Sequence, residues 1–543
     1  MRPPLLLQPD YTTFRCYYQI KLPLSVETMI PADDPVRLLS AFVEGMDLSE
    51  LYATYDRIRK NQATPRQMLK IMIYASMNHL FSSRDIETAC KRDINYMFLL
   101  DGMPVPDHAT IARFISLHLS ACSKELLANV TSMLHALGEV SGKTIFIDGT
   151  KIESCANKYT FVWKKTVTKN QARLFEKILS FIGECEELYG IKVVYTGKAT
   201  LHTLKRLRKK LYKIKDEENI DFVYGIGHRK SQLQKSVETL EGYICKLKEY
   251  TKHLHTCGER NSYSKTDPDA TFMRLKEDSM LNGQLKPAYN LQHGVDAQYI
   301  TWVGLSSHPS DVLTLVPFLK DMESHLPFKY REIVADAGYE SEEAYVFLEQ
   351  NGQESYLKPQ NYEISKTRKY QKDISRRENM EYDQEADEYL CTNGRRLKPI
   401  YNRRHKNRNG YVSTVTVYEC ESCHGCLYKE KCIHGNNCRT PLEERNKRLS
   451  ISKVMKQKRE ETLKRITTEY GTQLRMNRSI QAEGSFAVIK EDMNFRRYLY
   501  RGKENVLAQS VLLAIAYNIN KLHFKVQGGR TGQFLTELKT AYF

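Results

Sequence analysis

Two aspartates stand where short apolar runs of the chain end. Asp148 follows the run Ile145-Phe146-Ile147 in KTIFIDGTKIES and is itself followed by glycine. Asp336 ends a second apolar run in YREIVADAGYES and precedes Ala337 and Gly338. In α/β sheets ligands bind beyond the carboxyl ends of the strands, so both patterns place a carboxylate at a ligand site. Taken singly, each aspartate also suits a turn or a helix cap.

A third acidic residue, Glu483 in RSIQAEGSFAVIK, is predicted to open an amphipathic helix packed through Phe486, Val488 and Ile489. Three carboxylates at one sheet edge would repel one another unless a hard divalent cation lay among them. Magnesium and manganese prefer such oxygen ligands. Two such ions activate an attacking oxygen and stabilise a leaving one in phosphodiester chemistry. The pattern therefore predicts a magnesium or manganese site at Asp148, Asp336 and Glu483.

Basic residues accompany the third carboxylate. Lys490 lies seven residues after Glu483, two helical turns on, and therefore on the same helix face. A lysine beside an acidic metal site is typical of a contact with a substrate phosphate. Arg478, Arg497 and Arg501 extend this positive strip and are predicted to bind DNA; the alternative for any one of them is an ordinary surface charge.

The second candidate site is a cysteine cluster in YECESCHGCLYKEKC. Its spacing, C-x2-C-x2-C-x5-C, can place four thiolates around one zinc ion, at Cys420, Cys423, Cys426 and Cys432. Cys391 is an alternative ligand, and an iron–sulfur cluster or reduced free thiols are the other interpretations. The 13 cysteines of the chain are odd in number and clustered, which favours metal ligands over a disulfide framework.

The chain of 543 residues carries 82 Lys and Arg against 65 Asp and Glu, a net charge of +17. Such an excess favours a polyanionic partner, most commonly nucleic acid, although it also suits a merely basic surface. The N-terminal apolar run has only three leucines, too few for a signal peptide or a membrane span. The segment ENVLAQSVLLAIAYNINKL is interrupted by polar residues and predicts a buried helix. We expect a cytoplasmic protein without a membrane anchor.

The N-terminal part, from Leu39 to His118, has helical periodicity. A proline opens the helix of PRQMLKIMIYASMNHLF, and shorter helices follow in SSRDIETAC, DINYMFLL and DHATIARFISLHL, with Ser83 and Asp107 as expected caps. Short helices with tight turns suit a helix-turn-helix that enters a DNA groove, or a bundle that only packs on its neighbour.

The elements that must position the carboxylates alternate between strands and helices. Strands are predicted at Tyr289 to Val295 and Tyr299 to Ser306, joined at DAQ, and at YREIVADAGYES; helices are predicted at VLTLVPFLKDME and SEEAYVFLEQNG. This order indicates an α/β core with a mixed sheet. A further strand, YVSTVTVY, lies beside the basic RRLKPIYNRRHKNR, which suggests a clamp on DNA.

Between about Lys164 and Cys257 the chain becomes charged and leucine-spaced. Leucines fall seven apart, with Val237 and Ile244 between them, a coiled-coil pattern formed by Leu233, Leu240, Leu247 and Leu254. The earlier helix LHTLKRLRKKLYKIK has an apolar face that this pattern can cover. We expect a helical hairpin arm whose basic face either grips phosphates or is simply solvated.

Several of these segments together resemble one family. FIDGTKIESCANKYTFVWKK, DPDATFMRLKEDSM with GQLKPAYNLQHGVD, VADAGYES and RSIQAEGSFAVIKEDMNFRRYLYRG are similar to motifs of the DDE transposases of bacterial insertion sequences. The N-terminal helices are similar to the N-terminal domain of the same elements. The resemblance runs from about residue 25 to 525. It implies a ribonuclease H-like catalytic core, the fold of retroviral integrases.

The resemblance also implies roles for single residues. Asp148, Asp336 and Glu483 become the metal-binding catalytic triad, and the family's spacing of six residues between glutamate and lysine is met by Lys490. Arg478 departs from the pattern, because four residues instead of three separate it from Glu483 and no tyrosine stands three residues before it.

We accordingly expect six segments. They are an N-terminal helical DNA-binding domain (1–140), two parts of the core (141–165 and 263–355), a helical hairpin insert (166–262), a cysteine-rich insertion (356–450) and a C-terminal helical part of the core with a basic tail (451–543).

The implied function is metal-dependent cleavage and strand transfer at the element's terminal inverted repeats and at target DNA. The expected assembly is a homodimer on paired ends, in the cytoplasm and associated with the nucleoid. The alternatives are a catalytically inactive DNA-binding relative and a ribonuclease H-like nuclease without strand transfer.

Overall fold

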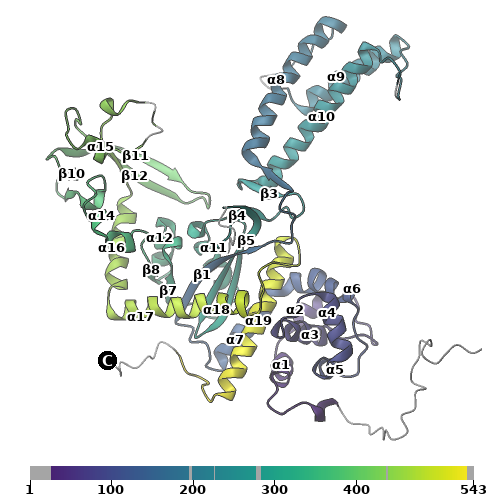
Figure 1. Ribbon diagram of the computed structural model, residues 1–543, viewed down its shortest axis with the longest axis vertical. Helices are drawn as coiled ribbons and strands as arrows, with labels where there is room; N and C mark the ends of the chain where they lie inside the picture. The colour runs from purple at the N-terminus through teal and green to yellow at the C-terminus, as the bar shows by residue number, and fades with distance from the viewer. Residues whose placement is uncertain are drawn as a thin grey trace, which may run out of the picture.

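The computed structural model describes residues 26–194, 199–225, 227–276, 283–435, 438 and 440–534. A central sheet with its helices forms the body of the molecule, and three peripheral parts surround it (Figure 1). The N-terminal helices pack on one side, a helical arm projects away from the body, and a second sheet stands apart from the first. The core positions the carboxylates and the two inserts flank it.

The central sheet is mixed. Its strands run in the order β4 (Thr271–Arg274), β5 (Leu285–Asp296), β1 (Thr144–Glu153), β7 (Glu332–Ala335) and β8 (Glu354–Leu357), and β6 (Tyr299–Ser306) also pairs with β5. β5 is antiparallel to β1, whereas β7 and β8 run parallel to it. The prediction of an α/β core with a mixed sheet is therefore confirmed.

The β5–β6 hairpin turns at the predicted place. Ala297 and Gln298 both have positive φ, 50° and 73°, as a tight two-residue hairpin turn requires. The helices predicted after β6 and β7 are also present, as α11 (Leu315–Glu323) and α12 (Glu342–Gln350).

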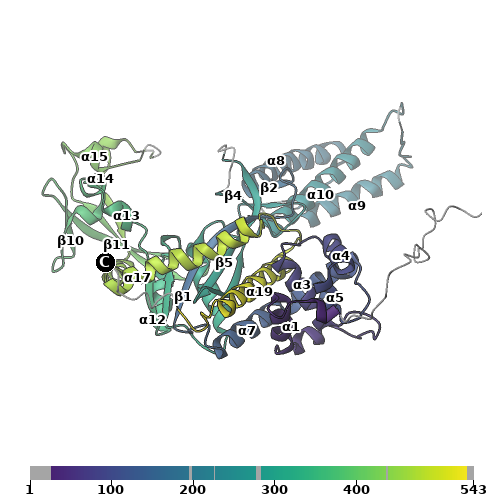
Figure 2. The same ribbon diagram turned by 60° about the horizontal axis from the view of Figure 1, so that its bottom comes forward.

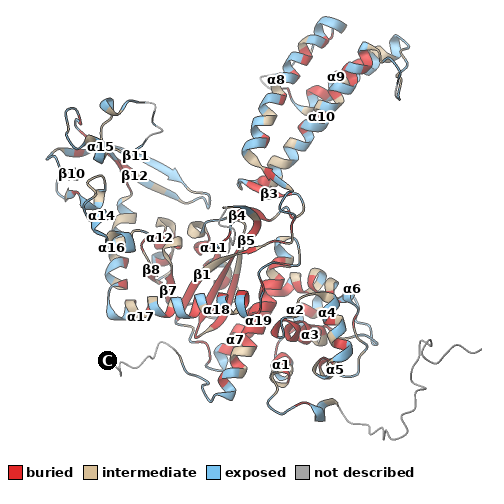
Figure 3. Ribbon diagram, viewed as in Figure 1, coloured by how far each residue is buried: buried red, intermediate tan, exposed pale blue. Residues whose placement is uncertain are grey.

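The last helix, α19 (Lys503–Gln527), lies at the centre of the molecule. Its apolar residues are buried between α7, β6 and α3, which confirms the predicted buried helix (Figure 3). One of the polar residues that interrupt this apolar run makes buried hydrogen bonds. The Asn518 side chain accepts from the Ile300 N–H at 2.8 Å and donates to the Ile300 carbonyl at 2.8 Å. These bonds satisfy backbone groups of β6 in the buried interface.

The N-terminal part is all-helical as predicted. Its helices are α1 (Pro35–Glu44), α2 (Ser49–Ala53), α3 (Pro65–Met77), α4 (Ser83–Arg92), α5 (Ile94–Leu100), α6 (His108–Arg113) and α7 (Ser120–Ala136). Asp107 caps α6 by accepting from the Thr110 N–H at 2.7 Å. Ser83 was expected as a cap but is the first residue of α4, and Ser82 holds the cap position. One continuous apolar cluster joins these helices to the core through α19.

The projecting arm has three helices, so the expected two-helix hairpin is corrected. α8 (Lys164–Tyr189) and α9 (Leu201–Glu217) both pack on α10 (Gln232–Cys257). The heptad residues of α10 from Leu233 to Leu247 are buried in the arm's own apolar cluster, while Leu254 is only partly buried. The short pair β2 (Phe161–Trp163) and β3 (Ser262–Ser264) closes the base of the arm.

The cysteine-rich insertion forms a separate antiparallel sheet. Its order is β13 (Arg448–Ile451), β12 (Val412–Cys420), β11 (Arg396–Lys406), β10 (Glu388–Leu390) and β9 (Glu381–Asp383). Short helices α13 (Tyr362–Ser365), α14 (Arg368–Gln371) and α15 (Lys429–Cys432) accompany it. In a second view the sheet and the arm stand at opposite ends of the core (Figure 2).

Candidate active site

Asp148 lies within β1, the middle strand of the central sheet. The prediction that a strand ends at this aspartate is wrong, because pairing with β5 extends β1 as far as Glu153. Asp148 is paired in register with His293 of β5. Gly149 follows because nothing larger fits: a Cβ there would lie 2.6 Å from the Gln292 side chain and 2.8 Å from the Tyr339 hydroxyl. The apolar residues before Asp148 bury the strand, and the glycine lets the sheet close tightly behind the carboxylate.

Asp336 follows β7 directly and sits beside Asp148. The parallel register pairs Ile147 with Ala335, so the two aspartates occupy equivalent positions one residue further along adjacent strands. Both line a cavity of about 220 Å³, together with Asp311 and Lys490. The structure thus brings together two residues that the sequence placed at separate strand ends.

Glu483 comes from a helix that crosses this end of the sheet. α17 (Glu469–Arg478) continues through a π-helical turn, η8 (Ser479–Glu483), into α18 (Gly484–Ala487) and a second π-helical turn, η9 (Val488–Asp492). Glu483 therefore ends a π turn inside one long helical segment; the expectation that it opens a helix is wrong. Such π turns frequently occur at functional sites.

The π turn explains the irregular spacing of Arg478. Its hydrogen bonds reach five residues along the chain, so residues five apart are stacked instead of residues four apart. Arg478 Nη2 accordingly donates to Glu483 Oε1 at 2.8 Å. Arg478 Nη1 lies 3.5 Å from Asp148 Oδ1, so one guanidinium connects two of the carboxylates. The π turn accommodates the extra residue between Arg478 and Glu483, so the two side chains still meet.

The charges of this site act on one another. Burial raises the pKa of Asp148 above its ordinary value, and the negative charges of Glu483 and Asp336 raise it further. The Arg478 charge and the Gly149 N–H act in the opposite direction. The three carboxylates are therefore close enough to interact, and the net effect of their surroundings is to disfavour ionised Asp148.

Within the described part of the chain, no three histidine, cysteine, aspartate or glutamate side chains stand close enough to hold a metal ion together. The donor chemistry still suits a hard cation, since acidic oxygens of two strands and one helix converge and repel. A cation already stands among them, because the Arg478 guanidinium neutralises Asp148 and Glu483.

Four polar residues behind the carboxylates were missed by the sequence reasoning. Asp311 Oδ1 accepts from Asn290 Nδ2 at 2.6 Å and from Gln292 Nε2 at 3.1 Å, and the Tyr339 hydroxyl donates to Gln292. A signal was present: Asn290 and Gln292 stand two apart in the strand AYNLQHG, and therefore on one face. Their network buttresses the cavity wall next to Asp148.

Of the predicted basic residues, one lines the carboxylate cavity and two bind backbone carbonyls of the chain after β1. Lys490 is buried and lines the carboxylate cavity. Arg497 donates to the Ser154 and Ala156 carbonyls at 3.2 and 3.1 Å, and Arg501 donates through Nε to the Cys155 carbonyl at 2.9 Å. These two arginines tie the C-terminal segment to the chain that leaves β1, a role the sequence did not indicate.

The cysteine cluster gathers in the insertion. Neighbouring Cys423, Cys391 and Cys426 thiols contribute to a raised pKa of Cys432, after the larger effect of burial. Burial, Cys423 and Cys391 raise the pKa of Cys420 to about 12. Cys391 therefore lies with the four predicted cysteines, although no metal-holding group is assembled there among the described residues. Cys438 is exposed.

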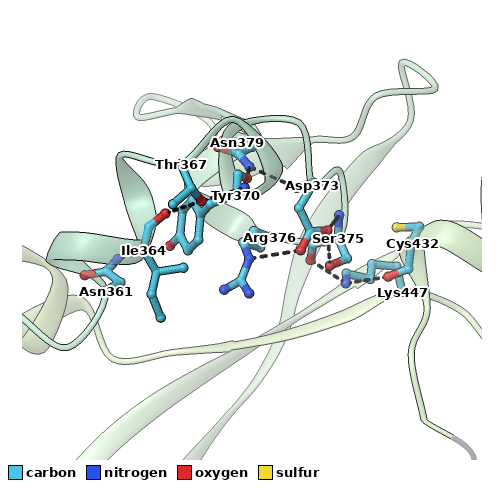
Figure 4. Close-up of polar contacts among 10 residues, drawn as sticks. All are labelled: Asn361, Ile364, Thr367, Tyr370, Asp373, Ser375, Arg376, Asn379, Cys432 and Lys447. Atoms are coloured by element: carbon cyan, nitrogen blue, oxygen red, sulfur yellow. Dashed lines mark hydrogen bonds and ion pairs between the residues drawn. The ribbon is translucent and has the colours of Figure 1, made fainter.

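One lysine supports this cluster from the protein side. Lys447 Nζ donates to the carbonyls of Ser375 and Cys432 at 2.7 and 2.8 Å, which joins the α14 segment to the cysteine loop (Figure 4). The Lys447 N–H also donates to Cys423 Sγ at 3.3 Å. A backbone donor of this kind stabilises negative charge on sulfur.

Comparison with protein families gives two matches. Residues 24–117 match a family described as "Transposase domain (DUF772)", and residues 390–523 match one described as "Transposase DDE domain". The second match spans the cysteine cluster, Glu483 and most of α19. Curated proteins gave no match, and neither did solved structures.

The match to a DDE domain indicates an enzyme that acts on DNA. Asp148 and Asp336 lie between the two matched regions, and Glu483 lies within the second. Both matches are to transposase domains, and together they support an insertion-sequence DDE transposase, a class whose general function is DNA strand cleavage and strand transfer. The described residues include no helix long and apolar enough to cross a membrane.

Proposed function

We propose that Asp148, Asp336 and Glu483 are the catalytic carboxylates of this transposase and that they hold magnesium or manganese. The observation that carries this assignment is the register of β1 and β7, which sets the two aspartates side by side, with Glu483 linked to Asp148 through Arg478. We assign the central sheet with its helices to the ribonuclease H-like class on the same grounds. The divalent ions would supply an activated attacking oxygen and charge neutralisation at the leaving oxygen.

The other residues of the site position the DNA strand. Lys490 faces the cavity of the aspartates, where its ammonium suits a phosphate of the substrate backbone. Before a divalent cation binds, Arg478 shields Asp148 and Glu483 from each other's negative charge. Once the cation has bound, the planar guanidinium of Arg478 is suited to bind the scissile phosphate. Arg497 and Arg501 fix the segment after β1, and we propose that the exposed Arg501 also reaches DNA through its Nη atoms.

We infer that the substrates are the element's terminal inverted repeats and a target duplex, held by a homodimer in the bacterial cytoplasm. The N-terminal helices are proposed to recognise the repeats. They share one apolar cluster with the core, so a helix bound in a DNA groove would be fixed relative to the carboxylates. The basic net charge of the chain, +17, supports a polyanionic substrate of this kind.

Metal binding tests the site directly. Calorimetric titration with Mn²⁺ is expected to show binding to the parent and at least tenfold weaker binding to Asp336→Asn, because one anionic ligand is lost. Glu354→Gln is a matched control, since that carboxylate lies on β8 and pairs with the exposed Arg331 outside the cavity. Equal Mn²⁺ affinity in parent and Asp336→Asn would remove the assignment.

For the cysteine insertion we propose a structural zinc ion. Its apolar core is small, formed by Met380, Tyr389, Leu397, Tyr418, Cys420, Cys423, Leu449 and Ile451, and modules of this size are commonly stabilised by a metal. We take Cys423, Cys426 and Cys432, which lie together in the cysteine loop, as three of the ligands, with the fourth ligand drawn from Cys391 or Cys420.

Zinc content per chain separates these choices. Cys423→Ser with Cys426→Ser is expected to abolish bound zinc. Of Cys391→Ser and Cys420→Ser, the one that lowers the zinc content identifies the fourth ligand. The exposed Cys245 on the arm provides the control substitution Cys245→Ser. Unchanged zinc in the double variant would exclude the zinc site.

A further inference from the structure

The β11–β12 pair extends from the cysteine insertion as a two-stranded ribbon. Residues 398–406 of β11 are exposed without interruption, so both faces of the strand meet solvent. β10 pairs only with the first residues of β11, and β13 pairs with β12 only from Thr416 to Glu419. Eleven residues of strand span roughly 35 Å at about 3.3 Å per residue. The exposed half of the ribbon has no third strand beside it, and two strands alone are marginal in water, so contact with a partner would stabilise it.

The ribbon carries positive charge on both faces. Alternation places Arg404 and Lys406 on one face and Arg403 on the other, and Arg408 follows in the turn. No acidic residue occurs between Arg396 and Tyr418. The inner cations Arg396 and Lys398 pair with carboxylates, whereas the four outer ones make no ion pair within the described residues. The unpaired charge thus lies in the outer half of the ribbon.

The tip of the ribbon is fixed to the catalytic core. Asn407 Nδ2 donates to Glu343 Oε2 at 2.6 Å, and the Tyr411 hydroxyl donates to Glu342 Oε1 at 2.9 Å. Both glutamates open α12, the helix that follows Asp336. Asn409 Nδ2 also donates to the Leu313 carbonyl at 3.2 Å. Leu313 ends a 3-10 turn, η4 (Asp311–Leu313), whose Asp311 lines the carboxylate cavity. The ribbon therefore spans from the insertion to the edge of the active site.

A second cavity, of about 450 Å³, lies beside this tip. Asn409, His308 and Lys503 line it, together with Gln292, whose side chain also contacts Asp311. Besides burial, the charges of Arg408, Arg260 and Lys503 lower the pKa of His308. Cations from the ribbon, the arm base and the start of α19 thus gather around His308 at this second cavity.

We propose that the β11–β12 ribbon binds the backbone of duplex DNA beside the scissile phosphate, through Arg403, Arg404, Lys406 and Arg408. A two-stranded ribbon fits the major groove of DNA, and its unpaired arginines and lysines suit phosphates on both sides. The proposal rests on the carboxylate site proposed above, because that site gives the ribbon its position on the substrate. The contacts are to phosphates, so the ribbon holds DNA without selecting its sequence.

Salt-dependent binding tests the proposal. Fluorescence anisotropy of a labelled random-sequence duplex, without divalent metal, is compared between the full-length parent and Arg403→Ala/Arg404→Ala. The slope of log K against log salt concentration is expected to fall by about 0.9 for each phosphate contact removed, hence by about 2. Arg403→Lys/Arg404→Lys should keep the parental slope, which excludes misfolding as the cause. An unchanged slope in the alanine variant overturns the proposal.

The matched control variant removes two positive charges, as the alanine variant of the ribbon does, but at the end of the parallel strands that lies opposite the carboxylates. Lys329 and Arg331 precede β7 and lie away from Asp336, so Lys329→Ala/Arg331→Ala should retain the parental slope. An equal fall in this control would show a general charge effect and overturn the ribbon proposal. The DNA-binding assay needs no metal, so it does not depend on the proposed carboxylate site. If that site is wrongly assigned, the separate Mn²⁺ titration will show it as unchanged Mn²⁺ affinity in Asp336→Asn.

Discussion

Arg478 bridges Glu483 and Asp148, with Nη2 2.8 Å from Oε1 of the first and Nη1 3.5 Å from Oδ1 of the second. At the metal site proposed above, the guanidinium would compete with a divalent cation for these oxygens. Arg478→Gln is therefore expected to bind Mn²⁺ more tightly than the parent. Its cleavage rate should nevertheless fall by about 10²-fold or more, as when a preorganised donor to developing charge is removed. Weaker Mn²⁺ binding, measured by calorimetry, would contradict the competition.

The π turn between these two residues can be removed by deletion. Deleting the exposed Ile480 would leave a regular α-helix in which Arg478 and Glu483 are four apart and remain on one face. Cleavage activity should be retained. Deleting Met476, which is similarly exposed, leaves the π turn and the spacing of five in place but rotates the preceding part of α17 by about 100° relative to Arg478. That variant should lose cleavage; if the two deletions behave alike, the π turn has no part in the site.

A buried ion pair holds the C-terminal helix to the core. Lys525 Nζ lies 2.9 Å from Glu139 Oε2, and the two side chains are only 6% and 2% exposed. Lys525→Met leaves Glu139 buried without its cation, and the free energy of unfolding is expected to fall by about 3–5 kcal/mol. Urea unfolding measures this. Glu139→Gln/Lys525→Met should recover part of the loss, whereas a double variant less stable than Lys525→Met would exclude the uncompensated charge as the cause.

Asp296 makes stability depend on pH. It is buried, and burial raises its pKa to about 7 in spite of hydrogen bonds from Ser141 and Gly142. The folded carboxyl keeps its proton between about pH 4 and 7, whereas the unfolded one loses it, so this residue contributes less stability as pH rises through that window. Asp296→Asn should therefore gain stability relative to the parent between these pH values, on the order of 2–4 kcal/mol. A constant difference in unfolding free energy across this range would show that Asp296 is ionised in the fold.

The sequence predicted those parts of the fold that local patterns encode. The DAQ turn, β6 and the position of Asp336 directly after β7 follow from strand periodicity and turn chemistry, and α19 follows from its apolar run. The continuation of β1 beyond Asp148 was missed, because it depends on pairing with β5. The third arm helix was missed because the charges of α8 obscured its apolar face, formed by Leu174, Ile178, Phe181 and Ile182. The sequence alone does not identify this face of α8, because the helix that covers it, α10, is known only from the fold.

Within the candidate site, the sequence singled out the three carboxylates but not the residues around them. Arg478 appeared displaced because side-chain spacing assumes α-helical turns, whereas the π turn is a property of backbone hydrogen bonding. Asp311 reaches the cavity through contacts with Asn290 and Gln292 of another strand, which no local pattern encodes. Cys391 lies near the other cysteines because of the β10–β11 turn, and no local sequence pattern encodes this proximity either.

The most direct test of the central claim is cleavage and joining of labelled DNA that carries the element's ends, with and without Mg²⁺, by the parent and by Asp336→Asn. The account predicts metal-dependent cutting and strand joining by the parent, and a loss of both in the variant while DNA binding is retained. Cutting by Asp336→Asn at the parental rate, or tight binding of the ends by the parent without any chemistry, would contradict it.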